Sequence, residues 1–129
     1  MQKYLLDTHA FLWWVTDHQS LSETARERIA DPESVVHFSV VSAWEISIKE
    51  SIGRLKLSSP PKRFVERQLQ ETGFRVLDIR LDHALEVSAL PVIHHDPFDR
   101  LLAAQCVCDR LTLLSRDQVL RRYAIDVVW

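Results

Sequence analysis

Short apolar segments alternate with helix-like segments along the chain, and this alternation restricts the possible folds more than any other feature. The predicted strands are residues 3–6, 35–39, 75–79, 111–114 and 125–129, with helices predicted between them. Residues 111–114 are continuously apolar, as in a strand buried on both faces of a parallel sheet. The pattern predicts a three-layer α/β/α sandwich with a central, mostly parallel sheet. With 129 residues, we expect one domain over residues 1–129.

Capping residues mark where the predicted helices begin and end. Residues 20–23 and 42–45 both have the S-x-x-E pattern of a capping box, which predicts a helix start at each. The pair Pro60-Pro61 opens another helix, and Gly73 is expected to end it. The clearest helix follows Asp96-Pro97, because Asp is a favoured N-cap and Pro a favoured first helical residue.

Four acidic side chains follow predicted strands. Asp7 ends the first strand, and Glu45 lies in the predicted first turn of the helix after the second. Asp99 lies in the first turn of a later helix, and Asp117 follows residues 111–114 by a short turn. Ligands of open α/β sheets bind beyond the carboxyl ends of the strands. We therefore expect these four acids to lie near one edge of the sheet.

Each of these acids also has a purely structural interpretation. Asp7 and Asp117 can cap the helices that follow them. Glu45 can be the third-position acid of a capping box, and Asp99 can complement a helix dipole. Together, however, neighbouring carboxylates repel one another and raise one another's pKa, and a hard divalent cation removes that conflict.

Ligand chemistry indicates which cation such a set would hold. Oxygen-only ligands suit Mg²⁺ or Mn²⁺ rather than zinc. These ions assist phosphodiester hydrolysis, because they lower the pKa of a water molecule and neutralise charge on the phosphate. The sequence therefore predicts a metal-dependent phosphodiesterase site with Asp7, Glu45, Asp99 and Asp117 as its ligands and catalytic residues.

Other polar side chains near the acids are secondary candidates. Thr8 and Ser115 can hydrogen-bond a carboxylate or a metal-held water, or can simply form caps and turns. Asp96 is an N-cap and a candidate outer member of the site. Lys49 and Arg100 are candidates for holding a substrate phosphate, although ordinary salt bridges with the adjacent acids are the commoner explanation.

Histidines and aromatic residues rank lower in the sequence argument. His9 lies two residues after Asp7, and whether it faces the metal site is left open. His94 and His95 are adjacent and should diverge, so neither is expected to rival the acids. Tryptophans at such positions are more often core or interface residues than stacking platforms for bases; these are Trp13, Trp14 and Trp44.

Composition excludes several function classes. The net charge of −2 and pI near 6.3 do not indicate a protein held on nucleic acid chiefly by charge, although they are compatible with a metal-dependent nuclease. The sequence has no Gly-rich phosphate loop and no apolar run near the ~20 residues of a membrane span. The sequence lacks a signal peptide, and Cys106 and Cys108 would point to different faces of a helix and so are not expected to form a disulfide; we therefore expect a cytoplasmic protein away from membranes.

The chain resembles the PIN-domain nucleases, specifically the VapC-type toxins of bacterial toxin–antitoxin pairs. The resemblance lies in four stretches, in the family's order: LLDTHAFLWW, SVVSAWEISIKESIGRLKL, LPVIHHDPFDRLLAAQ and LTLLSRD. The most specific parts are DTHAFLWW and HHDPFDRLLAAQ. By this resemblance the family's four acids fall on Asp7, Glu45, Asp99 and Asp117, and its accompanying hydroxyls on Ser115 and Thr8.

The resemblance also implies an activity and a set of partners. It implies a Mg²⁺- or Mn²⁺-dependent endoribonuclease that acts on RNA, with each of the family's metal ligands present in this sequence. It further implies a homodimer that is inhibited by a cognate antitoxin in a larger toxin–antitoxin complex. Operator DNA would be contacted only through the antitoxin.

Three rival classes fit parts of the sequence. A receiver-type phosphoacceptor would need two adjacent acids after the first strand and a lysine near the last one, but Asp7 stands alone and Arg116 is found instead. A haloacid-dehalogenase-type phosphatase would need an acid at the position of His9. A non-catalytic interaction module, with the acids serving only as caps, is the remaining alternative. Metal-dependent RNA cleavage distinguishes a nuclease from all three.

Overall fold

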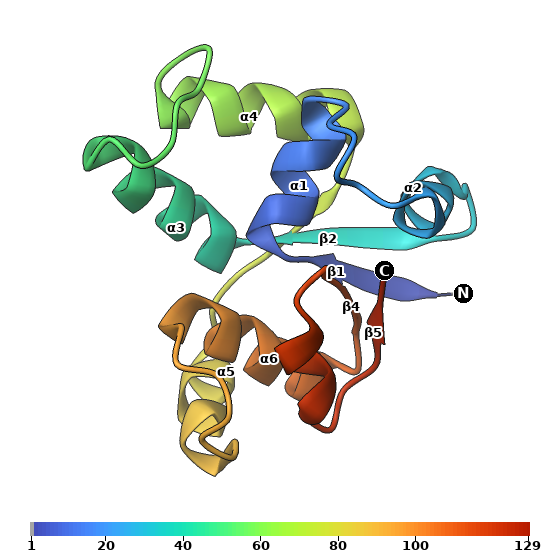
Figure 1. Cartoon of the computed structure of the whole chain (residues 1–129), viewed down its shortest axis with the longest axis vertical. Helices are drawn as coiled ribbons and strands as arrows, with labels where there is room; N and C mark the ends of the chain where they lie inside the picture. Colours follow the sequence, from blue (N-terminus) through green and yellow to red (C-terminus); the bar gives the residue numbers. More distant parts are fainter. Residues whose placement is uncertain (1) are drawn as a thin grey trace.

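The computed structural model describes residues 2–129, which form a five-stranded parallel sheet between layers of helices (Figure 1). The sheet order is β3-β2-β1-β4-β5, and every neighbouring pair is parallel. The strands are β1 (Lys3–Leu6), β2 (Val35–Ser39), β3 (Arg75–Leu77), β4 (Thr112–Leu114) and β5 (Val127–Val128). The predicted fold class is therefore confirmed. Met1, part of the predicted domain range, lies outside the described residues.

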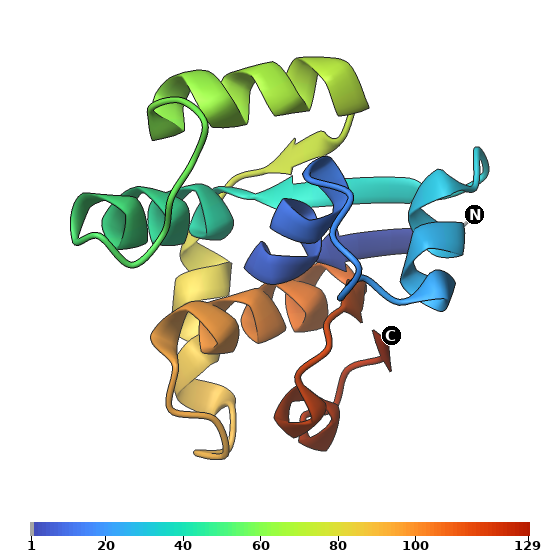
Figure 2. The same ribbon diagram turned by 45° about the horizontal axis from the view of Figure 1, so that its top comes forward.

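Helices cover both faces of the sheet (Figures 1 and 2). Their bounds are α1 (Thr8–Val15), α2 (Glu23–Ala30), α3 (Val40–Ser51), α4 (Pro61–Thr72), α5 (Leu81–Glu86) and α6 (Pro97–Asp109). Two 3₁₀ helices follow α5 and β4; these are η1 (Val87–Ala89) and η2 (Gln118–Arg122). The segment from Leu81 to Ala89 is thus a short α-helix followed by a 3₁₀ turn, and Gln118–Arg122 is purely 3₁₀. Between residues 2 and 129, no helix is long and apolar enough to cross a membrane.

Two hydrophobic cores lie on opposite faces of the sheet. Tyr4 and Leu6 of β1 belong to the core beneath α1, α2 and α4, and Leu5 between them belongs to the core beneath α6. This division follows from the period of two along a strand. The central strand is consequently apolar on both faces, as the sequence predicts for a buried parallel strand. Cys106 is buried in α6 and Cys108 is partly exposed; both are free thiols in the described chain.

Helix starts differ from the predictions at two places. Ser22, not Ser20, caps α2 by accepting the backbone N–H of Ala25 at 3.0 Å. Ser39 caps α3 by accepting the N–H of Val41, so β2 runs into α3 without a loop and the helix begins before residue 42. Both predicted capping boxes are therefore wrong. The sequence pattern does not say which of several nearby serines lies where the chain turns.

Other local predictions are confirmed. Gly73 ends α4 with a positive φ of 71°, a conformation that costs glycine little. Asp96 caps α6 and Pro97 is its first residue. The strands predicted at residues 75–79 and 125–129 are real but shorter, Arg75–Leu77 and Val127–Val128.

Parallel pairing brings three strand ends together. Leu6 is in register with Phe38 of β2 and Leu114 of β4. The residues that follow these in the chain are Asp7, Ser39 and Ser115, and all three are buried. The N–H of Asp7 still donates to the carbonyl of Leu114 at 3.1 Å. The carboxyl edge of β1 and β4 is therefore where Asp7 enters the structure.

Candidate metal centre

Five acidic side chains line one cleft at the carboxyl edge of the sheet. The cleft has a volume of about 270 Å³. Its acids are Asp7, Glu45, Asp96, Asp99 and Asp117, and its other lining residues are Thr8, His9, Trp13, Lys49 and Arg116. The structure thus brings the four predicted acids together although they come from different segments of the chain. It also places His9, which the sequence left open, at the wall of the cleft.

Asp7 is both a helix cap and a buried carboxyl group. Its side chain accepts the backbone N–H of Ala10 at 2.7 Å, which caps α1. Only 7% of the residue is exposed. Burial raises the pKa of Asp7, and hydrogen bonds from the Ser115 hydroxyl and the Ala10 amide oppose that rise. The capping interpretation is confirmed, but one amide does not account for a carboxylate buried this deeply.

Glu45 enters the cleft from the second turn of α3, because the helix begins at Val40. It is 4% exposed. One carboxylate oxygen accepts the Thr8 hydroxyl at 2.6 Å, and the other forms an ion pair with the Nζ of Lys49. Thr8 therefore holds a carboxylate, as predicted, and the salt bridge expected for Lys49 is present. A hydroxyl of α1 and an amine of α3 fix the orientation of Glu45 across the cleft.

His94 lies between Asp99 and Asp117. Its Nε2 is 2.7 Å from an Oδ2 of Asp117 and 3.3 Å from an Oδ2 of Asp99. Its Nδ1 accepts the backbone N–H of Asp96 at 3.0 Å. In neutral imidazole, Nδ1 is then the acceptor and Nε2 carries the hydrogen, so Nε2 donates toward the two carboxylates.

From the sequence, His94 is not expected to rival the acids, and the structure corrects that expectation. The expected divergence of the two histidines is present, because His95 is exposed while His94 turns into the site. The loop that carries His94 is fixed by Tyr123, whose hydroxyl accepts the His94 backbone N–H at 2.9 Å. The available signal was the spacing of His94 two residues before the N-cap Asp96, which allows the Nδ1 contact.

The surroundings of Asp99 disfavour the ionised form of its carboxyl group. Burial, and then the charges of Asp96 and Asp7, raise the pKa of Asp99 to about 7, and His94 only partly offsets them. The pKa of Asp7 is also raised. Buried carboxyls whose ionisation is this unfavourable fit a hard divalent cation, which prefers oxygen ligands. The donor set of Asp7, Glu45, Asp99 and Asp117 is of this kind.

The Arg100 side chain is not among the cleft-lining residues, contrary to the prediction from the sequence. Its guanidinium donates to the carbonyls of Pro91 and Val87, each at 3.0 Å, and to the hydroxyl of Tyr123 at 3.2 Å. These contacts hold the loop before α6 from the side away from the cleft. The expectation of a phosphate-binding Arg100, or of a salt bridge with Asp99, is therefore wrong: the side chain fills its donors with loop oxygens instead.

Asp96, Asp117 and Ser115 support the cleft through backbone contacts. Asp96 accepts the N–H of Phe98 at 2.8 Å and caps α6. Asp117 accepts the N–H of Val119 at 3.0 Å and caps η2 while its other oxygen faces His94. The buried hydroxyl of Ser115 accepts the N–H of Asp117 at 3.1 Å. The caps predicted for Asp96 and Asp117 are therefore present, and both acids also line the cleft, where the sequence analysis expected them.

Trp13 forms the aromatic wall of the cleft. Its ring centroid lies 5.3 Å from that of His9 and 5.7 Å from that of His18, and the guanidinium carbon of Arg116 is 5.9 Å from the ring centre. Trp14 packs against the core, as expected. Trp44 is 52% exposed and lies edge-on to Phe98. Trp13 is thus partly a core residue and partly a wall of the site.

The chain is similar in sequence to known proteins. Residues 4–126 match the family model described as PIN domain. The chain belongs to the PIN domain family. This PIN-domain chain is 27% identical over 124 residues to a protein named Ribonuclease VapC22 of Mycobacterium tuberculosis (strain ATCC 25618 / H37Rv), covering 95% of the chain and 93% of that protein.

Solved structures share the fold of this PIN-domain chain. A structure of VapBC2 from Rickettsia felis bound to a promoter DNA fragment aligns with a TM-score of 0.73 at 12% identity, covering 98% of each chain. A DNA-bound VapBC structure from Salmonella typhimurium aligns with a TM-score of 0.71 at 17% identity, covering 99% of this chain and 98% of that one. At these identities the likeness establishes the fold.

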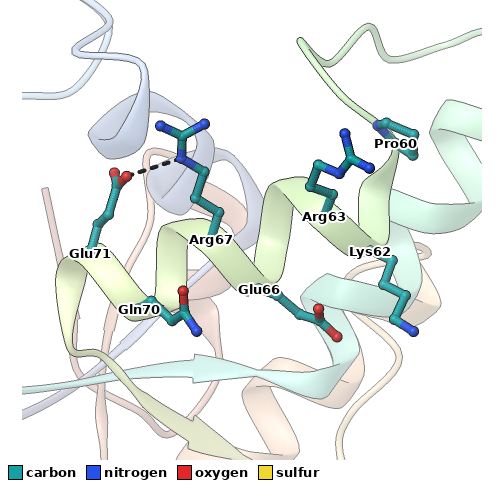
Figure 3. Close-up of a pocket in the computed structure, with 7 residues that line it drawn as sticks. All are labelled: Pro60, Lys62, Arg63, Glu66, Arg67, Gln70 and Glu71. Carbon is teal, nitrogen blue, oxygen red and sulfur yellow. Dashed lines mark hydrogen bonds and ion pairs between the residues drawn. The ribbon is translucent and has the colours of Figure 1, made fainter.

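A larger hollow on the PIN-domain chain lies along α4 and has a different character. It measures about 740 Å³, and its lining side chains come from α4 and from Pro60 just before it (Figure 3). They carry both charges, and Arg67 pairs with Glu71 at 3.1 Å (Figure 3). The hollow has no converging set of buried carboxyls among the described residues. Size alone therefore does not identify the functional site, and the acidic cleft remains the candidate.

Proposed function

We propose that this chain is a metal-dependent endoribonuclease and the toxin component of a toxin–antitoxin pair. The observation that carries the proposal is the convergence of Asp7, Glu45, Asp99 and Asp117 in one cleft whose carboxyls are costly to ionise. Membership of the PIN domain family and similarity to a protein named ribonuclease VapC22 support it. Capping alone would not require these four acids to face the same small volume.

The four acids would hold Mg²⁺ or Mn²⁺. When bound, the cation supplies charge neutralisation at the scissile phosphate and makes a water molecule more acidic. Thr8 orients the Glu45 carboxylate, and the Ser115 hydroxyl opposes the rise in the pKa of Asp7. Lys49 lies on the cleft wall and pairs with Glu45. If Glu45 held the metal, the ammonium of Lys49 would be available to bind a substrate phosphate. Asp96 would contribute indirectly, because it caps α6, the helix that carries Asp99.

Partners follow from the toxin assignment. We expect a cognate antitoxin, a homodimer within a larger toxin–antitoxin complex, a cytoplasmic location, and contact with operator DNA only through the antitoxin. The VapBC structures from Rickettsia felis and Salmonella typhimurium, which are bound to DNA, support the part of this expectation that concerns a DNA-bound complex. A non-catalytic interaction module of the same fold is the alternative.

RNA cleavage by the purified chain tests the proposal. Total RNA is incubated with the protein in EDTA, Mg²⁺ or Mn²⁺, and cleavage sites are mapped by sequencing of the new ends. We expect defined sites that depend on the metal, that disappear in Asp7→Asn, and that persist in Glu66→Gln. Glu66 is an exposed acid on α4 that lines the hollow along this helix (Figure 3) and is not among the cleft-lining residues, so it controls for the loss of one negative charge.

Two results would contradict the nuclease assignment. Metal-dependent cleavage that survives in Asp7→Asn would mean that the cleft is not the site of the reaction. If the wild-type protein cleaves no RNA with either metal, and Asp99→Asn leaves the growth inhibition seen on expression unchanged, the interaction module becomes the better description.

A further inference from the structure

The acidic cleft continues into a groove between α1 and α3. The groove has a volume of about 230 Å³ and shares Thr8, His9, Glu45 and Lys49 with the cleft. Beyond those shared residues it is lined by Leu12, Ile46, Arg54 and Leu55. The two helices lie beside one another on the same side of the sheet edge (Figures 1 and 2). A strand that leaves the metal centre in this direction would enter the groove directly.

The position of Arg54 is set by the turn that ends α3. Gly53 has a φ of 75°, and its N–H donates to the carbonyl of Glu50 at 3.1 Å. The N–H of Arg54 donates to the carbonyl of Lys49 at 2.8 Å. This pair of bonds is the Schellman motif, in which a left-handed glycine closes the helix. Arg54 is therefore held by backbone geometry beside Lys49 at the rim of the groove.

Charge distinguishes the groove from the cleft. The cleft contains five carboxyls, whereas Glu45 is the one acid among the groove-lining residues, and Lys49 already pairs with it. Arg54 is exposed, and its guanidinium has no ion pair or side-chain hydrogen bond with any residue from 2 to 129. A guanidinium with its donors available can bind a phosphate through two parallel hydrogen bonds.

The floor of the groove, beside the Arg54 guanidinium, is apolar. Ile46 is fully buried beneath the groove, and Leu12 and Leu55 are half-buried. The exposed ring of His9 lies at the boundary with the cleft and is tilted 32° against Trp13. A basic rim next to an apolar and aromatic surface is what proteins use to hold single-stranded nucleic acid. A basic peptide segment would instead meet Lys49 and Arg54, which carry the same charge as itself.

We propose that the groove between α1 and α3 is a nucleotide subsite for the RNA strand. In it, Arg54 binds the phosphate next to the scissile one, and the partly exposed Leu12 and Leu55 above the buried Ile46 receive the adjoining base. The inference rests on the proposed ribonuclease function and adds the path of the substrate to it. It gives the acidic chain a local region of positive charge for RNA without requiring a basic surface overall.

RNA affinity in the absence of cleavage tests the subsite. A labelled single-stranded RNA oligonucleotide containing a mapped cleavage site is titrated with the Asp7→Asn protein, and binding is followed by fluorescence anisotropy. Adding Arg54→Glu to that protein should weaken binding about tenfold or more, as expected for loss of a charged hydrogen-bond pair. Adding Arg63→Glu, which makes the same charge change on the outer face of α4 (Figure 3), should change it less than about twofold.

Salt dependence and a modified substrate separate the two parts of the subsite. With Arg54→Gln, the slope of log affinity against log salt concentration should become shallower by about 0.7, the value for one phosphate contact on a single strand. An oligonucleotide that lacks the base beside the cleavage site should bind the parent protein more weakly. The same omission should have a smaller effect when Leu55 is replaced by Asp, because the floor is then already disrupted.

The outcomes distinguish failure of the subsite from failure of the function. If the wild-type protein cleaves RNA but Arg54→Glu binds and cleaves like Arg63→Glu, the subsite is refuted and the nuclease assignment stands. If Arg54→Glu keeps its RNA affinity but loses affinity for the antitoxin, the groove holds a protein segment instead. If the wild-type protein cleaves no RNA, the function fails and the subsite fails with it.

Discussion

Replacing Asp99 with Asn should make the metal-free protein more stable at pH 8, even though it removes a residue of the proposed metal site. Burial and the neighbouring acids raise the pKa of Asp99 from 3.8 to about 7. That change corresponds to a cost of ~4 kcal/mol for holding the ionised group in the folded protein. Asn has a similar shape and no charge, so the variant avoids the cost, and ~4 kcal/mol is the largest gain to expect.

The gain should depend on pH in a defined direction. Below about pH 4 the carboxyl is protonated in both folded and unfolded chains, so it has no net effect on stability. Between pH 4 and 7 the unfolded chain has released this proton while the folded protein retains it, so the free energy of unfolding falls as pH rises. Above pH 7 the full cost is present. The advantage of Asp99→Asn should therefore be near zero at pH 4 and greatest at pH 8.

Urea unfolding in EDTA at pH 4, 6 and 8 measures this directly. Asp126→Asn, at an exposed position in the loop before β5, is the matched control, and its stability should stay close to that of the wild-type protein at all three pH values. Mn²⁺ should then stabilise the wild-type protein at pH 8 and have little effect on Asp99→Asn, because binding to the folded state adds to its stability. A variant that is less stable than wild type at pH 8, or whose gain does not grow with pH, would refute the reasoning.

Three further predictions concern packing, capping and the acidic cluster. His94→Ala should lower the free energy of unfolding in EDTA, because it removes the hydrogen-bond donor between two carboxylates, whereas exposed His95→Ala should leave urea unfolding unchanged. Phe11→Ala should cost about 3–5 kcal/mol by urea unfolding, since the ring is fully buried; a loss below about 1 kcal/mol would mean that the core is not packed as described. Ser22→Ala should cost about 1 kcal/mol by thermal or urea unfolding and Ser20→Ala much less, and the reverse order would restore the capping box predicted from the sequence.

Local features of this protein were predictable from the sequence because a few neighbouring residues determine them. The alternation of apolar runs with helical segments identified the parallel α/β fold. Gly73 marked a helix end because its left-handed conformation suits glycine, and Asp96-Pro97 marked a helix start because each residue satisfies the first turn. Asp7 and Asp117 could be expected near one another because they follow β1 and β4, and parallel strands end at the same edge of a sheet.

Side-chain directions between separate segments depend on tertiary packing, and no local pattern contains them. His94 faces two carboxylates while its neighbour faces solvent, because Tyr123 fixes the loop from another part of the chain. Arg100, next to an acid in sequence, turns away because loop carbonyls satisfy its guanidinium. Asp7 is ambiguous as a cap in the sequence, and its buried cleft exists only once β1, β4, α3 and α6 are packed together. Strand and helix patterns are encoded over a few residues, whereas burial and charge coupling arise from residues that meet only in the folded chain.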